Sequence, residues 1–310
     1  MKKQLTQEAF DRAADFLRTQ ARPLERALFA HAFEDGRRTA VLAALVPYQN
    51  DDGGFGHGLE PDMRAAASSV VATTLALGIL RRIGATEETS GLPAALVYLI
   101  DNYDAESGRW PIISPGVEDA PHAPWWNYAE SEANFRGFWA NPRAAVVGYL
   151  WQYRKLVPSP FVEGALRAAA TDLLSYAHHM EMHDLLCYID LVDTDGLPGE
   201  LWQNMTDKLR RAVARSVETN PAEWGGYNLM PLQVIHSPQS ELAPAVAPEV
   251  LEANLDYLID TQAADGSWAP AWSWDFVDAA AWAAAEREWR GVLTLRHLET
   301  LHAFGRIAGM

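Results

Sequence analysis

The chain has one cysteine, Cys187, among its 310 residues. No intrachain disulfide can form, and so low a cysteine content is typical of a reducing compartment, so we predict a cytoplasmic location. The first residues, Met-Lys-Lys-Gln-Leu-Thr, include two bases but no apolar stretch behind them. We therefore expect no secretory signal.

Long apolar runs and basic residues are also scarce. No run approaches the about 20 apolar residues that a membrane-spanning helix needs, so we predict no membrane span. The chain has 25 Lys and Arg against 41 Asp and Glu, a formal net charge of −16. Because nucleic-acid binding depends on basic patches, we predict no nucleic-acid partner.

Several motifs of cofactor and metal chemistry are missing. The chain has no Gly-x-Gly-x-x-Gly fingerprint, no Walker loop, no Gly-x-Ser-x-Gly elbow and no Asp-Asp-x-x-Asp run. His179 and His183 are four residues apart and could share a metal on one helical face, but no third ligand can be named. We predict neither a cofactor nor a metal.

Helical periodicity dominates what is present. A hydrophobic fraction of 49% suffices for a large core, and no Ser/Gly-rich linker divides the chain, so we predict one all-α domain over residues 1–310. The expected helices cover residues 5–20, 23–33, 39–49, 65–83, 93–103, 142–157, 160–182, 183–192, 200–218, 227–236, 248–262 and 279–307. Residues 108–137 form a long irregular segment, and the run 65–83 is apolar nearly all round, as in a helix packed on both sides.

One turn sequence recurs along the chain. Residues 49–56 read Gln-Asn-Asp-Asp-Gly-Gly-Phe-Gly, and residues 262–268 read Gln-Ala-Ala-Asp-Gly-Ser-Trp. Weaker echoes occur at residues 107–110 and 223–227. Glycine supplies turn conformations that other residues resist, and the aromatic residue can pin the turn to a neighbouring helix. The recurrence predicts a fold of repeated units.

The repeat resembles the Gln/Trp-type repeats of squalene-hopene cyclases and of the protein prenyltransferase β subunit. The match is best over residues 41–84 and 255–305. This resemblance implies an α/α toroid of about six inner and outer helix pairs around a central cavity. The prenyltransferase zinc site would need an Asp-x-Cys pair, whereas Asp184 and Cys187 have the wrong spacing, so we predict no such site.

Four residues near the first turn are candidate site residues. By the resemblance, Glu60, Asp62 and Arg64 would lie at the mouth of the cavity, with the acids as candidate catalytic groups. His57 lies between two glycines, which allow close approach of a ligand. The alternative is that Asp62 begins the helix over 65–83, where the helix dipole favours acids.

A second acidic group is the sequence Asp193-Thr-Asp195-Gly196. Cyclases that protonate an alkene or epoxide use an Asp-x-Asp-Asp motif, in which burial and a neighbouring carboxylate keep one acid protonated. The resemblance implies that Asp193 or Asp195 is the proton donor, although Gly196 replaces the fourth acid. The alternative is an Asp/Gly turn that ends a helix.

Aromatic residues complete the candidate site. The chain has 12 Trp, and many tryptophans indicate large packed interfaces or an aromatic-lined concave site. The candidates for substrate contact are Trp125, Trp126, Trp139, Tyr227, Trp272 and Trp274. Such side chains suit a hydrocarbon and a sugar ring equally, and several of them must belong to the core.

Three functions follow from these features. The first is an enzyme that cyclises or isomerises an apolar isoprenoid by acid initiation. The second is a carbohydrate-active enzyme, a lyase or glycoside hydrolase, that uses paired carboxylates such as Glu60, Asp62, Asp193 and Asp275. The third is a non-catalytic toroid that binds a lipid or a protein, with its acids paired to arginines such as Arg64 or Arg143 and titrating normally.

Overall fold

The computed structural model describes residues 2–176 and 180–310, and these residues are all-helical. They contain no β-strand, only isolated bridges such as the one between Leu5 and Ile307. None of the described helices is long and apolar enough to span a bilayer. The predicted all-α class is confirmed.

The chain forms two compact units, Met1–Leu45 with Val217–Met310, and Val46–Ser216. The helices of the first unit are α1 (Gln7–Thr19), α2 (Pro23–Phe33), α3 (Arg38–Leu45), α11 (Pro248–Asp260) and α12 (Ala279–Ala303). Those of the second are α4 (Val70–Arg82), α5 (Leu92–Asp101), α6 (Ser131–Asn134), α7 (Arg143–Gln152), α8 (Ser159–Ser175), α9 (Met182–Val192) and α10 (Gly199–Ser216). That the units form a single domain stays a prediction.

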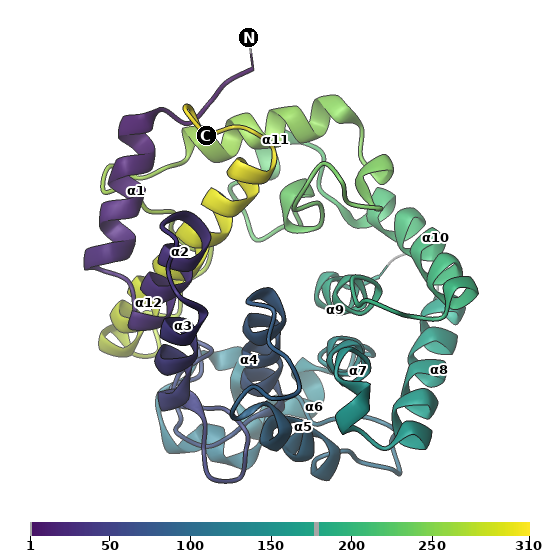
Figure 1. The fold of residues 1–310 in the computed structure, drawn as a ribbon. Helices are drawn as coiled ribbons and strands as arrows, with labels where there is room; N and C mark the ends of the chain where they lie inside the picture. Colours follow the sequence, from purple (N-terminus) through teal and green to yellow (C-terminus); the bar gives the residue numbers. More distant parts are fainter. Residues whose placement is uncertain (1, 177–179) are drawn as a thin grey trace. The chain divides into compact units, whose positions relative to one another are not determined.

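The second unit is built from consecutive helix pairs. α5 packs on α4, α8 packs on α7, and α10 packs on α9. One helix of each pair also meets the next pair, because α4 contacts α7 and α7 contacts α9. Figure 1 shows α8 and α10 covering one side of the α7–α9 pair. Within this unit the helices therefore form two layers.

α7 is enclosed on every side. All residues from Arg143 to Trp151 are buried. Gly148 lets α9 approach closely, since an added Cβ would lie 3.1 Å from the Leu191 Cα atom. We expected such enclosure for residues 65–83, yet α4 leaves Leu75 exposed.

The helix predicted over 65–83 begins only at Val70, and Asp62 does not lie in its first turn. The N–H of Ser69, the N-cap residue, donates to the Phe55 carbonyl at 2.9 Å. This bond between distant residues keeps the chain before Val70 extended. The prediction that Asp62 starts the helix was therefore wrong.

Two further predicted helices differ from the structure. Residues 227–236 contain only the short 3-10 turn Pro231–Gln233, because the N–H of Glu218 pairs with the carbonyl of Leu229 at 2.8 Å. The helix predicted over 160–182 ends at Ser175.

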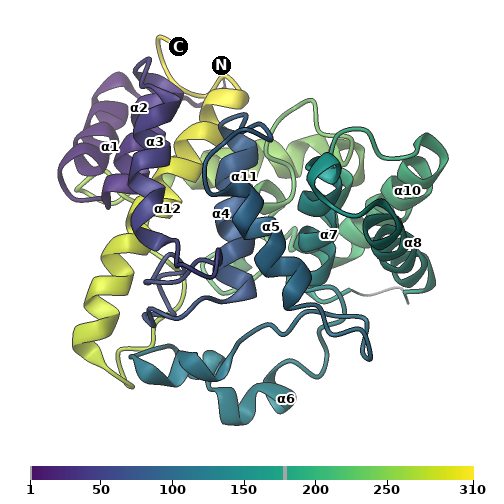
Figure 2. The same cartoon turned by 60° about the horizontal axis from the view of Figure 1, so that its bottom comes forward.

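The irregular segment 108–137 lies at one end of α4, α5 and α7 (Figure 2). Its backbone pairs with the loop before α4, where the Ala123 N–H donates to the Asp62 carbonyl at 2.9 Å and the Arg64 N–H to the Pro121 carbonyl at 3.2 Å. The segment is thus attached to the loop that holds the first candidate acids.

The two repeat turns are held by the same glutamine contacts. The Gln49 side-chain N–H donates to the carbonyls of Gly53, at 3.0 Å, and Gly91, at 2.8 Å. Gln262 makes an equivalent pair of bonds, at 3.0 Å within its own turn and at 2.9 Å to the carbonyl of Ala9. Each glutamine therefore ties its turn to the start of a helix, α5 in one unit and α1 in the other.

The glycine of each turn cannot be replaced without strain. Gly53 and Gly266 have φ angles of 85° and 88°, in the left-handed region. An added Cβ would lie 2.4 Å from the backbone of Ala94 at one turn and of Arg12 at the other. The shared conformation and the shared close approach confirm that the turns are copies of one unit.

The aromatic residue of each turn is anchored through its backbone. The N–H of Phe55 donates to the Thr73 hydroxyl at 3.0 Å, and that of Trp268 to the Thr294 hydroxyl at 3.1 Å. The Trp268 indole N–H also donates to the carbonyl of Leu258, in α11, at 2.8 Å. The aromatic side chain of Trp268 thus pins its turn to a helix, as predicted, whereas the bond at Phe55 comes from the backbone.

Candidate functional site

The C-terminal end of α9 carries two carboxylates on one face. Asp190 and Asp193 are three residues apart, a spacing that brings helical side chains together. The Asp193 N–H donates to the Ile189 carbonyl at 3.0 Å and ends the helix. The prediction of an acidic turn at a helix end is thus correct, but the turn also belongs to a larger cluster.

Arg81, at the end of α4, joins α9 to α7. Its guanidinium donates to the Asp190 carboxylate at 2.8 Å and to the Asp190 carbonyl at 2.9 Å. The same guanidinium lies 4.7 Å from the ring centre of Tyr149. We call Arg81, Tyr149, Tyr153, Asp190 and Asp193 the acid cluster.

Asp193 has the most perturbed carboxyl of this cluster. Burial, and secondly the negative charge of Asp190, raise the pKa of Asp193 to about 6, while Arg81 acts in the opposite direction. The residue as a whole is exposed, so the carboxyl is crowded by neighbouring atoms on one side and open to solvent on the other. Such a carboxyl carries a proton close to neutral pH and can still exchange it.

The two tyrosines present neutral hydroxyl groups. Burial, and then the charge of Asp190, raise the pKa of Tyr149 well above its usual range. Tyr153 is 3% exposed, and its hydroxyl forms no hydrogen bond within residues 2–176 and 180–310. Gly78 makes room for Tyr149, because an added Cβ would lie 2.9 Å from the Tyr149 hydroxyl.

Asp195 differs from Asp193 in the charges around it. Both residues are exposed, and neither side chain forms a hydrogen bond or ion pair in the described part of the chain, but only Asp193 is influenced by the charges of Asp190 and Arg81. The turn that carries Asp195 is fixed through Gly196, which has a φ of 72° and whose carbonyl accepts the Trp151 indole N–H at 3.0 Å. Of the two predicted donors, the structure brings only Asp193 into a cluster.

The candidates after the first turn lie in the loop before α4. Glu60 and Asp62 are buried. The Arg64 guanidinium passes over Gly58, since a Cβ added there would lie 3.5 Å from it. His57 is exposed with a φ of 56°, and its Nε2 lies 2.8 Å from the side-chain oxygen of Asn50. His57 thus belongs to the repeat turn.

The aromatic candidates of the second unit lie in or beside the irregular segment. Trp125 and Trp126 are half-buried, and Trp126 packs on Phe135 with ring centres 5.7 Å apart. Trp139 is 52% exposed, and the Arg109 guanidinium lies 4.5 Å from its ring centre.

In the first unit the aromatic candidates pack edge to face. Trp272 lies 5.7 Å from Tyr227 and 5.0 Å from Trp289, between ring centres. Trp274 is completely buried, 5.8 Å from Trp282. Tyr227 is exposed, so the candidates of this unit range from a fully buried to an exposed side chain.

Metal binding finds no support in the described residues, where no group of three or more His, Cys, Asp or Glu side chains could hold a metal ion. His183 Nδ1 lies 2.7 Å from a Glu181 carboxylate oxygen. His179, the other histidine considered for a metal pair, lies outside the described residues.

Sequence reasoning missed Arg81, Tyr149 and Tyr153. Tyr149 and Tyr153 are four residues apart on α7, but this spacing is common in buried helices and gives no specific signal. Arg81 and Asp190 are 109 residues apart, so only the packing of α4, α7 and α9 brings them together.

Comparison of the sequence with models of protein families found no match, and comparison with curated proteins found none either. The resemblance to the cyclase superfamily therefore rests on the repeat turns and on the acid motif.

Proposed function

We propose that the protein is a terpenoid-cyclase-like enzyme that cyclises or isomerises an apolar isoprenoid, with Asp193 as the proton donor. The observation that carries the proposal is the Asp193 carboxyl, whose pKa is raised to about 6 by burial and by Asp190. At this pKa about a tenth of the carboxyl is protonated at pH 7 and about nine tenths at pH 5.

An α/α toroid is the fold that this proposal requires, and features within each unit support it. Three consecutive helix pairs form two layers in the second unit. In the first unit α1 packs on α12 and receives the glutamine of the last turn, as α5 packs on α4 and receives that of the first turn. α1, the N-terminal helix, is thus paired with α12, the C-terminal helix, and a closed ring of helix pairs would need such a pair.

The proposed chemistry begins with one proton transfer. The O–H bond of the Asp193 carboxyl breaks, a C–H bond forms on an alkene carbon, and a carbocation and the Asp193 carboxylate result. Asp190 remains ionised because Arg81 donates to it at 2.8 Å. Loss of a proton from the cation to a base, or capture of water, ends the reaction. Aromatic faces stabilise the cation meanwhile.

The non-catalytic alternative expects acids with ordinary titration. Arg143 does pair with Asp172, as that alternative requires of an arginine. Asp193, however, has a pKa raised to about 6 and is the observation that favours an enzyme.

Incubation of the purified protein with squalene and with geranyl, farnesyl and geranylgeranyl diphosphates and alcohols tests the proposal. Products are read by gas chromatography and mass spectrometry. Asp193→Asn removes the proton and preserves the shape, and Asp195→Asn serves as the matched control because Asp195 lies outside the acid cluster.

We expect a hydrocarbon or alcohol product with the wild type and with Asp195→Asn, and none with Asp193→Asn. A product that survives in Asp193→Asn would rule out this donor and direct attention to Glu60 and Asp62. No product from protein shown to be folded would contradict the isoprenoid activity.

A further inference from the structure

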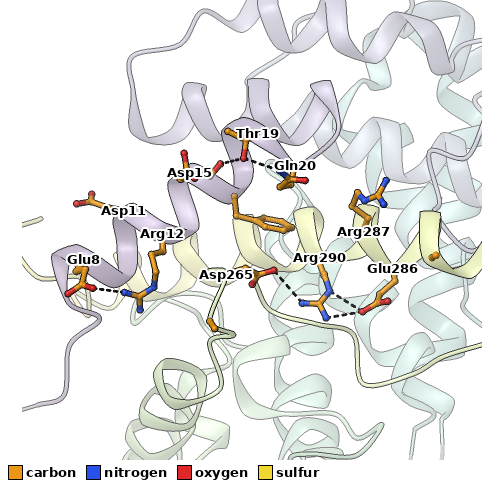
Figure 3. Close-up of a pocket in the computed structure, with 13 residues that line it drawn as sticks. Glu8, Asp11, Arg12, Asp15, Thr19, Gln20, Asp265, Glu286, Arg287 and Arg290 are labelled. Atoms are coloured by element: carbon orange, nitrogen blue, oxygen red, sulfur yellow. Dashed lines mark hydrogen bonds and ion pairs between the residues drawn. The ribbon is translucent and has the colours of Figure 1, made fainter.

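The two repeat turns carry the same carboxylate, but only one has a cation beside it. At the turn of the first unit, Arg290 lies 4.0 Å from the Asp265 carboxylate and donates to the Ser267 hydroxyl at 2.9 Å. Figure 3 shows Arg290 between Asp265 and Glu286, in contact with both. The carboxylate of this turn is neutralised from within the chain.

Asp52 is the equivalent carboxylate in the second unit. One of its oxygens accepts the Gly54 N–H at 2.9 Å and the Ser68 hydroxyl at 2.8 Å. Asp52 forms no ion pair with any described residue. The copy of the turn in this unit therefore lacks the cation that its counterpart has.

An open pocket of about 650 Å³ lies beside this carboxylate, and both acids that line it, Asp52 and Asp101, are exposed. Its polar lining includes Asn50, Asp52, Ser68, Tyr98, Asp101 and Asn102, and no Lys, Arg or His lines it. Asp101 forms no side-chain hydrogen bond or ion pair in the part of the chain that the structure describes. The pocket thus holds two negative charges and no positive one.

Tyr98 gives a second and independent indication of a ligand. It is 7% exposed, and its hydroxyl forms no hydrogen bond with any described residue. Its ring lies against Gly54, since an added Cβ there would lie 2.7 Å from a ring carbon. The ring is thus held in the protein, while the hydroxyl reaches the solvent of the pocket without a protein partner, so it can donate to or accept from a bound molecule.

The internal repeat shows that the fold does not need this hydroxyl. Tyr98 comes seven residues after Gly91, whose carbonyl receives the turn glutamine. Seven residues after Ala9, the equivalent acceptor, stands Phe16, which lines the space beside Asp265. In the first unit, where Arg290 lies beside the turn, a phenylalanine ring without a hydroxyl therefore occupies the position equivalent to Tyr98.

We propose that this pocket binds a small organic ammonium ion, whose charge takes the place of Arg290. The ammonium would donate to the carboxylates of Asp52 and Asp101 and to the Tyr98 hydroxyl. A bare metal ion is a poor occupant because no three metal-ligating side chains converge within residues 2–176 and 180–310. The proposal is independent of the acid cluster and of the proposed enzymatic activity.

Isothermal titration with putrescine, at low ionic strength, tests the site. Butanediol, which has the same chain with hydroxyl groups in place of the ammonium groups, is the matched control ligand. Asp101→Asn and Asp52→Asn remove one charge each while keeping an acceptor oxygen. Tyr98→Phe converts the position to the residue found at Phe16. Asp15→Asn, at an exposed position of α1, reduces the net negative charge equally without touching the pocket.

We expect putrescine to bind and butanediol not to bind. Each Asp→Asn change in the pocket should raise the dissociation constant for putrescine about fivefold, because it removes one contact to the ammonium. Tyr98→Phe should raise it about as much for the same reason. Asp15→Asn should leave it unchanged. Equal binding of the diol, no binding of putrescine, or equal weakening by Asp15→Asn and by the pocket variants would overturn the proposal.

Discussion

At the scale of single residues, the protein places titratable groups where burial changes their protonation. The pKa of Asp193 is raised and that of His297 is lowered relative to the values in the unfolded chain. Asp193 is held closer to its neutral acid form by burial and Asp190. His297 is held in its neutral base form by burial and, secondly, by Arg296. Each shift makes stability depend on pH, with opposite signs.

Asp193→Asn tests the first shift. Because the folded pKa of about 6 exceeds the ordinary 3.8, Asp193 favours the folded state below about pH 4, and this contribution is lost as the pH rises through about 6. The asparagine variant should therefore melt about 3 °C higher than wild type at pH 8, and show no gain at pH 4. Thermal unfolding followed by circular dichroism measures the melting temperatures at both pH values. A difference between variant and wild type that is the same at pH 4 and pH 8 would refute the shift in the Asp193 pKa.

His297 gives the converse prediction. Its pKa is lowered from 6.5 to about 3, so it stabilises the fold above pH 6.5, and this stabilisation is lost as the pH falls toward 3. Between pH 7 and pH 5 the His297→Leu variant should lose about 1–2 kcal/mol less unfolding free energy than the wild type loses. Urea unfolding at the two pH values provides the test.

At the scale of elements, the repeat turn is the part of the structure that the sequence predicts most completely. Its contacts are local or end at a neighbouring helix, so the sequence Gln-x-x-Asp-Gly predicts most of them. The start of α4 could not be predicted, because the bond between Ser69 and Phe55 that precedes it depends on the tertiary fold. The helix expected over 227–236 is likewise absent, because the Leu229 carbonyl accepts from the distant Glu218 N–H and the 3-10 turn that begins at Pro231 follows.

The candidate site divides in the same way. Asp193 was identifiable because a motif of adjacent acids is visible in one stretch of sequence. Its partner Arg81 was not, because α4 and α9 meet only through packing. The difference in environment between Asp193 and Asp195, two residues apart, also depends on which side of the turn faces α4.

The glutamines of the two turns should contribute equally to stability. Gln49→Ala and Gln262→Ala each remove two hydrogen bonds to backbone carbonyls. The expected cost is about 1–3 kcal/mol of unfolding free energy in each case, measured by urea unfolding. Gln203→Ala is the control, because this exposed glutamine makes one bond, to Asp207. A cost at only one turn would contradict the equivalence of the repeats.

At the scale of the whole molecule, the two chain ends meet within the first unit. The Leu5 N–H donates to the Arg306 carbonyl at 2.7 Å, and the Ala308 N–H to the Leu5 carbonyl at 2.9 Å. Arg306 is 2% exposed and donates to Asp256 at 2.9 Å and to Glu252 at 2.8 Å. These contacts keep α1 beside α12, as the proposed ring of helix pairs demands.

Arg306→Ala tests this contact between the termini. Loss of the buried guanidinium leaves the Asp256 carboxylate without its partner, whereas Glu252 keeps Lys2 at 2.7 Å, so we expect about 2 kcal/mol of destabilisation and faster hydrogen exchange in α1. Arg306→Lys should recover only part of the loss, because lysine lacks the planar guanidinium. Unchanged exchange in α1 would show that the termini are held by other contacts.

The central claim is that the pKa of Asp193 is raised to about 6, and a carbon-13 NMR titration of the aspartate carboxyl signals tests it most directly. Selective labelling and the Asp193→Asn variant identify the signal, without any need to know the substrate. We predict a midpoint of about 6 for Asp193, and a lower midpoint when Asp190→Asn removes the neighbouring charge. A midpoint near the ordinary value of 3.8 would contradict the account and remove Asp193 as the proton donor.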